Sequence, residues 1–78
     1  MYFTYVLRSE KDKKLYVGST NDLKTRFEEH IKGKVPSTKN RRPLKVVYYE
    51  ACIDKNKAFK REAYFKTGFG RRFLKSRI

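Results

Sequence analysis

Two reactive side chains, Arg26 and His30, stand four residues apart in a segment with the pattern of a helix. Apolar residues recur there at every fourth position, at Leu23, Phe27 and Ile31, which is typical of an amphipathic helix that packs on a core. At ~100° per residue, both reactive side chains fall at the edge of this apolar stripe and away from the solvated face. A guanidinium carries a permanent charge, and an imidazole titrates near neutral pH. By position, neither residue is an ordinary surface charge.

Two tyrosines are further candidates, because they lie in segments with the composition of strands. Tyr5 belongs to the aromatic and β-branched run 2–8, and Tyr16 belongs to the run 15–18. The polar residues 9–13 between them predict a turn, so we expect a hairpin that pairs the two strands. A tyrosine in a strand also packs well against its neighbours, and packing is the alternative role for both.

A carboxylate on a second helix completes the set of candidates. Glu62 follows Ala58 by four residues, which places both on one side of that helix, and it is the only acidic residue among residues 55–78. A carboxylate on the inward face of a helix is costly unless it is paired or holds a cation. A cation site and an ion pair with a neighbouring lysine or arginine are therefore the two interpretations of Glu62.

Capping residues indicate where the first helix begins and ends. Asn21 or Asp22 is expected to cap its N-terminus, and Gly33 is expected to end it, which predicts a helix over about 23–32. The segment 33–43 that follows is rich in basic residues and is expected to be an irregular loop.

The second half of the chain predicts one strand and two helices. The β-branched and aromatic run 44–51 reads as a third strand. Asp54 or Asn56 is expected to cap the second helix, Gly68 is expected to end it, and a short basic helix is expected over 71–77.

This order of elements predicts an α/β (α+β) fold, with a small three-stranded antiparallel or mixed sheet flanked by helices. A chain of 78 residues is short, and it buries only about 60% of its unfolded surface. We therefore expect a single domain over residues 1–78, in which any site shares the one core.

The chain is strongly basic. Lysine and arginine total 21 against 8 acidic residues, which gives a net charge of +13 at pH 7. A charge of this sign and density indicates a polyanionic partner, most often nucleic acid, and favours an anionic membrane surface less. Non-specific phosphate contacts are expected at five positions: Lys39, Arg41, Arg42, Arg71 and Arg72.

The composition also argues against some classes of protein. No stretch approaches the ~20 apolar residues of a membrane-spanning helix. Cys52 is the single cysteine, so no internal disulfide can form, and a reducing, cytoplasmic setting is expected. One cysteine and one histidine are too few for a zinc site of the usual kind.

These residues, in this order, resemble the GIY-YIG nuclease superfamily and in particular its small stand-alone branch. The second signature tyrosine, Tyr16, follows Tyr5 by eleven residues. The matching positions are the strand segments Thr4–Leu7 and Tyr16–Gly18, the helix pair Arg26 and His30, and Glu62 with Ala58 before it. The resemblance covers essentially the whole chain.

The resemblance implies a three-stranded sheet flanked by helices and the hydrolysis of phosphodiester bonds with one divalent ion, Mg²⁺ or Mn²⁺. Glu62 would hold the ion, and Arg26 would contact the phosphate. Tyr16 would act as the general base and Tyr5 would orient the water, with His30 as the alternative base. Since phenols ionise near pH ~10, a tyrosine base needs a neighbouring positive charge. We expect these five side chains to converge on one solvent-reachable cleft.

The chain departs from the family in two places. Ser19 stands where nucleotide-excision relatives carry a lysine, and no asparagine follows Glu62, although many family nucleases have one there. One hypothesis is therefore a metal-dependent endonuclease that acts on DNA in preference to RNA, selects structure or nothing, and serves DNA repair or recombination. The other is a module that binds DNA or structured RNA and retains the fold without catalysis.

Overall fold

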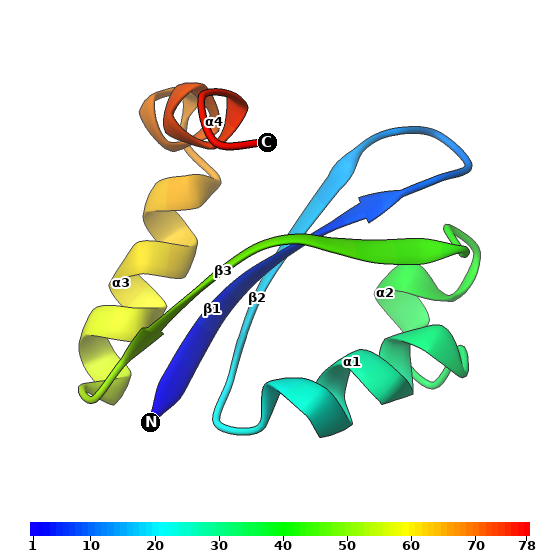
Figure 1. Ribbon diagram of the computed structural model, residues 1–78, viewed down its shortest axis with the longest axis horizontal. Helices are drawn as coiled ribbons and strands as arrows, with labels where there is room; N and C mark the ends of the chain where they lie inside the picture. The colour runs from blue at the N-terminus through cyan, green and yellow to red at the C-terminus, as the bar shows by residue number, and fades with distance from the viewer.

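Three strands form one antiparallel sheet in the computed structural model, which describes residues 1–78 (Figure 1). The central strand β1 (Tyr2–Ser9) pairs with β2 (Leu15–Thr20) on one side and with β3 (Leu44–Cys52) on the other. The expected α+β sheet is therefore confirmed, and it is antiparallel throughout. Because β1 is central, β2 keeps one edge free of pairing.

Four helices cover the two faces of this sheet. α1 (Leu23–Ile31) and α2 (Pro36–Lys39) lie on one side, while α3 (Lys55–Phe65) and α4 (Gly68–Lys75) lie on the other (Figure 1). None of these helices has the length and apolar character needed to cross a membrane.

The core is divided by the sheet, because successive strand residues point to opposite faces. The buried cluster under α3 and α4 consists of Val6, Val17, Phe65 and Leu74. The cluster under α1 consists of Tyr5, Leu7 and Leu44, with Leu23 and Phe27 of the helix packed against it. Tyr5 and Val6 are neighbours in the chain but belong to different clusters, which is the alternation expected of a strand.

The structure shows which of the two expected residues caps each helix. Asp22 caps α1, since its carboxylate accepts a hydrogen bond from the Thr25 amide at 3.1 Å. Asp54 caps α3 in the same way through the Lys57 amide. Gly33 follows α1 with a φ of +76°, a left-handed conformation in which glycine carries no Cβ penalty.

Two expectations about loops and helix ends were wrong. The segment 33–43 contains α2, a single turn that begins at Pro36, where the fixed φ of proline suits a helix start. Gly68 does not end α3, which stops at Phe65, but is the first residue of α4. The cause is Thr67, whose hydroxyl accepts a hydrogen bond from the Gly70 amide and so starts α4 before Arg71.

Replacing the two glycines of α4 should have different effects. A methyl group at Gly70 would collide with the Tyr64 carbonyl oxygen and the Phe65 backbone, whereas one at Gly68 would meet no atom within 4 Å. We expect Gly70→Ala to lower the free energy of unfolding by about 2 kcal/mol or more, because α4 must move away from α3. Gly68→Ala should leave it unchanged or slightly raised. Urea unfolding of both variants measures the difference, and equal stabilities would contradict this packing.

Candidate active site

A buried chain of hydrogen bonds lies under α1. The Tyr5 hydroxyl is 2.9 Å from Nε2 of His30, and Nδ1 of the same imidazole is 2.7 Å from the Thr38 hydroxyl. Tyr5 is 1% exposed and His30 is fully buried. Both imidazole nitrogens therefore have partners inside the protein, and neither reaches solvent.

His30 takes an inward position that the sequence pattern had assigned to Ile31. Leu23, Phe27 and His30 follow the spacing i, i+4, i+7, and all three contact the core side of α1. Ile31 is instead 50% exposed. The polar ring can replace an aliphatic side chain there because Tyr5 and Thr38 satisfy it.

Burial keeps this pair uncharged near neutral pH. Burial lowers the pKa of His30, and the positive charge of Arg26 lowers it further. Burial also raises the pKa of Tyr5, although the neighbouring Arg26 guanidinium opposes the shift. A neutral imidazole donates through one nitrogen and accepts through the other, so it can accept from Tyr5 at Nε2 while donating to Thr38. In this arrangement His30 orients the Tyr5 ring.

Tyr16 and Arg26 are the two members of the cluster that reach the surface. The Tyr16 ring lies 5.2 Å from the His30 ring and 6.4 Å from the Tyr5 ring. Arg26 has a side chain that is 38% exposed, and it pairs with Glu29 at 3.3 Å. The structure thus brings together four of the expected site residues, two buried and two accessible.

Gly18 explains why the two tyrosines can lie so close. It pairs with Tyr5 across the β1–β2 ladder, and the hydroxyl end of the Tyr5 side chain covers it. A Cβ atom at this position would collide with the Tyr5 hydroxyl. The glycine therefore allows the phenol to extend over β2 toward its free edge.

Glu62 approaches β2 from α3. The Ser19 hydroxyl donates to its Oε1 at 2.6 Å, and the Lys66 ammonium donates to its Oε2 at 3.0 Å. The carboxylate side chain is 23% exposed, while that of Lys66 is 57% exposed. The ion pair considered as the alternative role is present, but its lysine lies mostly in water.

The expectation that all five side chains converge on one solvent-reachable cleft was wrong. Tyr5 and His30 are buried, and Glu62 lies across the sheet from Tyr16, because Tyr16 and Ser19 point to opposite faces of β2. The two faces meet at the free edge of β2. The charge of Glu62 makes a small contribution to the raised pKa of Tyr5, after the larger effect of burial.

A groove lies beside Tyr16 and reaches Lys66, the ion-pair partner of Glu62. It has a volume of about 760 Å³, and both Tyr16 and Lys66 line it. Its basic members, which we call the basic groove, are Lys13, Lys14, Arg41, Lys66, Arg71 and Lys75. Positive charges from the β1–β2 turn, the segment before β3 and the two C-terminal helices therefore gather beside Tyr16.

The five expected phosphate contacts separate into two groups. Arg41 and Arg71 line the basic groove. Arg42 donates to the carbonyl oxygens of Lys39 and Ile31, so it holds the end of α1 against α2. Arg72 lies 5.4 Å over the Phe69 ring, and Lys39 is exposed in the last turn of α2.

Sequence reasoning missed several partners of the site. Thr38 gave no signal, because it lies in a segment expected to be irregular and contacts His30 eight residues away. Ser19 was noted only as a departure from the family, and its bond to Glu62 spans 43 positions. Lys66 could have been found, since it follows Glu62 by four residues on one helix.

The residues around Glu62 fit one divalent ion with few protein ligands. No three His, Cys, Asp or Glu side chains gather to form a complete cage. Each oxygen of Glu62 has a single protein partner, so a lone pair remains on each, and the exposed Lys66 can move away. Mg²⁺ commonly uses one or two carboxylates and keeps several waters, which suits this donor set.

Fold and site together define a class of protein: paired tyrosines on a hairpin, an arginine and a histidine on α1, and a glutamate on a later helix of an antiparallel α+β domain. Residues 1–75 match the family model described as the GIY-YIG catalytic domain. The chain therefore belongs to the GIY-YIG family. Membership supports nuclease activity and a nucleic-acid substrate.

Within this family the chain is similar to UPF0213 proteins. It is 40% identical over 67 residues to one from Clostridium perfringens, a match that covers 85% of this chain and 71% of the relative. It is 41% identical over 66 residues to YazA of Bacillus subtilis, covering 83% of this chain and 66% of the relative. The chain thus spans only part of the length of these relatives.

A solved structure supports the fold. The solution NMR structure of a UPF0213 protein from Bacillus halodurans is similar with a TM-score of 0.60 and 29% sequence identity. The similarity covers 97% of this chain and 84% of that one.

Proposed function

We propose that this protein is an endonuclease that hydrolyses phosphodiester bonds in DNA, in preference to RNA, with one Mg²⁺ or Mn²⁺ ion at Glu62. It selects substrate structure, or nothing, in preference to a base sequence. The net charge of +13 supports a polyanionic substrate. We place the activity in the cytoplasm, in DNA repair or recombination.

One observation carries the proposal: Tyr16 and Lys66 line the same basic groove, and Lys66 is bonded to Glu62. A phosphate in this groove would contact the phenol, and Lys66 links the groove to the Glu62 carboxylate beside it. Glu62 stands among positive charges, since every other charged residue of 55–78 is basic. A lone carboxylate in such a place would repel phosphate unless a cation lies between them.

The accessible side chains would perform the chemistry. Tyr16 is half-buried and lines the groove, and in its phenolate form its oxygen would accept the proton of the attacking water. Arg26 offers a charged fork to the phosphoryl oxygens, which gain negative charge in the transition state. A bound divalent ion would supply charge neutralisation at the phosphoryl and leaving oxygens.

The buried pair has a different role in this proposal. His30 is fully buried and has partners on both ring nitrogens, so it cannot take a proton from water without breaking those bonds. We therefore assign the base to Tyr16. Tyr5 and His30 are positioning residues, which hold the surface against which the Tyr16 ring packs.

Cleavage assays of the wild-type protein on a panel of nucleic-acid substrates test the proposal directly. We expect nicking of branched or flap DNA when Mg²⁺ or Mn²⁺ is present, and no product when the ion is chelated. RNA and fully paired DNA of the same length complete the panel. Binding without cleavage of any substrate would favour the second hypothesis, a nucleic-acid-binding module. In that case Glu62 keeps its hydrogen bonds to Ser19 and Lys66 and binds no metal ion.

Binding should depend on the basic groove and not on basic residues in general. Replacing Arg71 and Lys75 by Ala removes two groove charges, so the slope of log affinity against log salt should flatten by about 1.4 to 1.8. Replacing Arg72 and Arg77 removes the same charge from the same segment, outside the groove, and should change the slope less. Fluorescence anisotropy titrations at several salt concentrations measure both. Equal changes would mean that the whole surface binds.

A further inference from the structure

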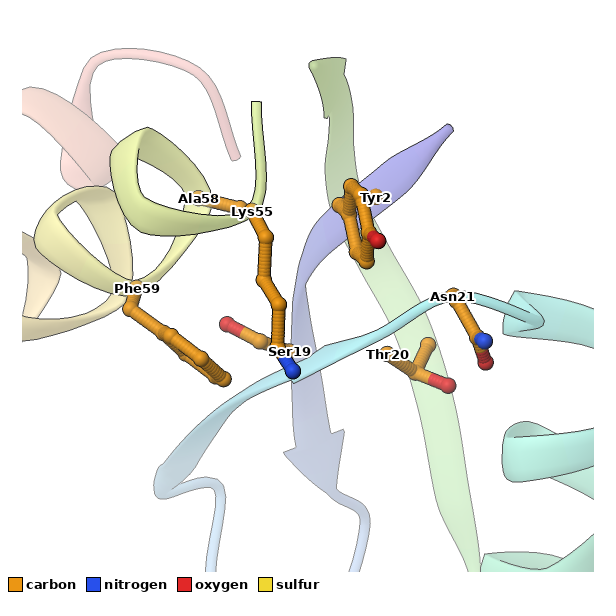
Figure 2. A pocket seen from close by; sticks show the side chains of 7 residues that line it. All are labelled: Tyr2, Ser19, Thr20, Asn21, Lys55, Ala58 and Phe59. Carbon is orange, nitrogen blue, oxygen red and sulfur yellow. The ribbon is translucent and has the colours of Figure 1, made fainter. Parts of the chain in front are cut away.

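A second cavity lies on the α3 face of the sheet, at the end of β2 away from the basic groove. It has a volume of about 310 Å³, and Figure 2 shows the side chains that line it. We call it the aromatic pocket, and its lining residues are Tyr2, Ser19, Thr20, Asn21, Lys55, Ala58 and Phe59. None of the residues assigned to catalysis lines it.

The walls of this pocket combine aromatic rings with polar groups. Phe59 of α3 is 50% exposed, so part of its ring can be reached from solvent. In Figure 2, Phe59 and Lys55 extend from α3 toward Ser19, and Tyr2 stands across from them on β1. The Lys55 ammonium lies 5.7 Å from the centre of the Phe59 ring. The amide of the exposed Asn21 adds donors and an acceptor at the end of β2.

The pocket is joined to the candidate active site by a single side chain. Ser19 lines the pocket, and its hydroxyl donates to Oε1 of Glu62 at 2.6 Å. On the other side, Lys66 lines the basic groove and donates to Oε2 of the same carboxylate. Glu62 therefore lies between a groove that suits phosphates and a pocket that suits a flat ring with polar edges.

We propose that the aromatic pocket receives one unpaired nucleobase, from a nucleotide next to the phosphate at Glu62. The base stacks on Phe59, places its polar edge at Asn21, and leaves its phosphate near Lys55. This inference rests on the proposed function, and it specifies the substrate class: nucleic acid with at least one unpaired base beside the cleavage point. A base inside a duplex is stacked and paired, so it cannot enter without being extruded.

The pocket also offers a physical basis for structure selection. Stacking on an aromatic side chain tolerates any base, because every base has a π-face. The protein can therefore require an unpaired base without reading the sequence.

Binding measured without a metal ion tests the pocket independently of catalysis. The probe is a single-stranded DNA 12-mer with one 2-aminopurine, in buffer with EDTA. We expect the wild-type protein to quench the 2-aminopurine by stacking, and Phe59→Ala to weaken binding by about tenfold and to remove the quenching. Phe69→Ala is the matched control, since Phe69 is an exposed phenylalanine, at 70%, on α4 outside the pocket.

Two further probes fix the occupant as a base. One probe is a 12-mer in which every nucleotide lacks its base, and the other is a blunt duplex of the same length. Neither presents an unpaired base to the pocket, so the wild-type protein and Phe59→Ala should bind each probe equally. Thermal melting checks that both variants fold. The pocket assignment is overturned if Phe59→Ala binds the labelled strand like wild type, if Phe69→Ala loses as much, or if the loss persists on the abasic strand or the duplex.

The outcome is separable from that of the proposed nuclease. Stacking in EDTA without cleavage in Mg²⁺ would retain the pocket and reject the enzyme. If the wild-type protein and Phe59→Ala show the same metal-dependent cleavage of both paired and unpaired substrates, the enzyme assignment is retained and the pocket assignment is rejected.

Discussion

Glu62→Gln is expected to reduce metal-dependent cleavage by about 10³-fold while leaving DNA binding in EDTA nearly unchanged. The amide keeps an oxygen that can accept the Ser19 hydroxyl, but it lacks the charge that attracts the ion. Metal-free affinity depends on the basic groove, whose charged residues all remain, although Lys66 loses its ion-pair partner. Single-turnover cleavage and anisotropy measurements on the same preparations provide the two numbers.

Thermal unfolding measurements distinguish a metal-binding role of Glu62 from a structural one. Its ion pair with Lys66 involves a lysine that is 57% exposed, and such pairs contribute only about 0–1 kcal/mol. Thermal unfolding of Glu62→Gln should therefore stay close to wild type. Glu28→Gln, on the exposed face of α1, removes the same charge as a control and should cleave normally. A strongly destabilised Glu62→Gln would instead identify the carboxylate as a structural partner.

Tyr16→Phe is the second large effect, with cleavage expected to fall by about 10²- to 10³-fold. The phenol oxygen is the group that would accept the proton of the attacking water, and phenylalanine removes only that oxygen. The ring contacts with Tyr5 and His30 remain, so the free energy of unfolding should change little. Affinity for DNA in EDTA should also be retained.

Tyr5→Phe makes the matched comparison, because it removes the same atom from the neighbouring buried ring. The change leaves Nε2 of His30 without its partner, so we expect it to lower the free energy of unfolding by about 1–3 kcal/mol. Its effect on cleavage, measured where the variant is fully folded, should be smaller than that of Tyr16→Phe. If Tyr5→Phe were the less stable and also the less active variant, the base would have to be reassigned to the Tyr5–His30 pair.

The sequence alone determined the features that depend on near neighbours. Asp22 and Asp54 cap their helices by accepting amide hydrogens three residues ahead, so the capping signal is complete within one turn. The alternation of Tyr5 and Val6 between the two sheet faces follows from the pleat of a strand. The net charge, the antiparallel hairpin and the spacing of the family motif required no tertiary information either.

Only the tertiary structure decided which side of a helix is inward when a polar residue competes with an apolar one. His30 is buried and Ile31 is exposed because Tyr5, 25 positions away, and Thr38 supply hydrogen bonds that no local pattern contains. The same holds for Gly70, whose missing Cβ allows the backbones of α3 and α4 to touch at Tyr64 and Phe65.

The candidate site combines both kinds of information. Residue types and spacing predicted Tyr16, Arg26 and Glu62, but not that the carboxylate would approach β2 from the face opposite Tyr16. The basic groove and the aromatic pocket consist of side chains from elements far apart in the sequence, brought together by the packing of α3 and α4 on the sheet. Sequence periodicity reports the orientation of a side chain within its own element, whereas a cavity exists only after several elements have packed around it.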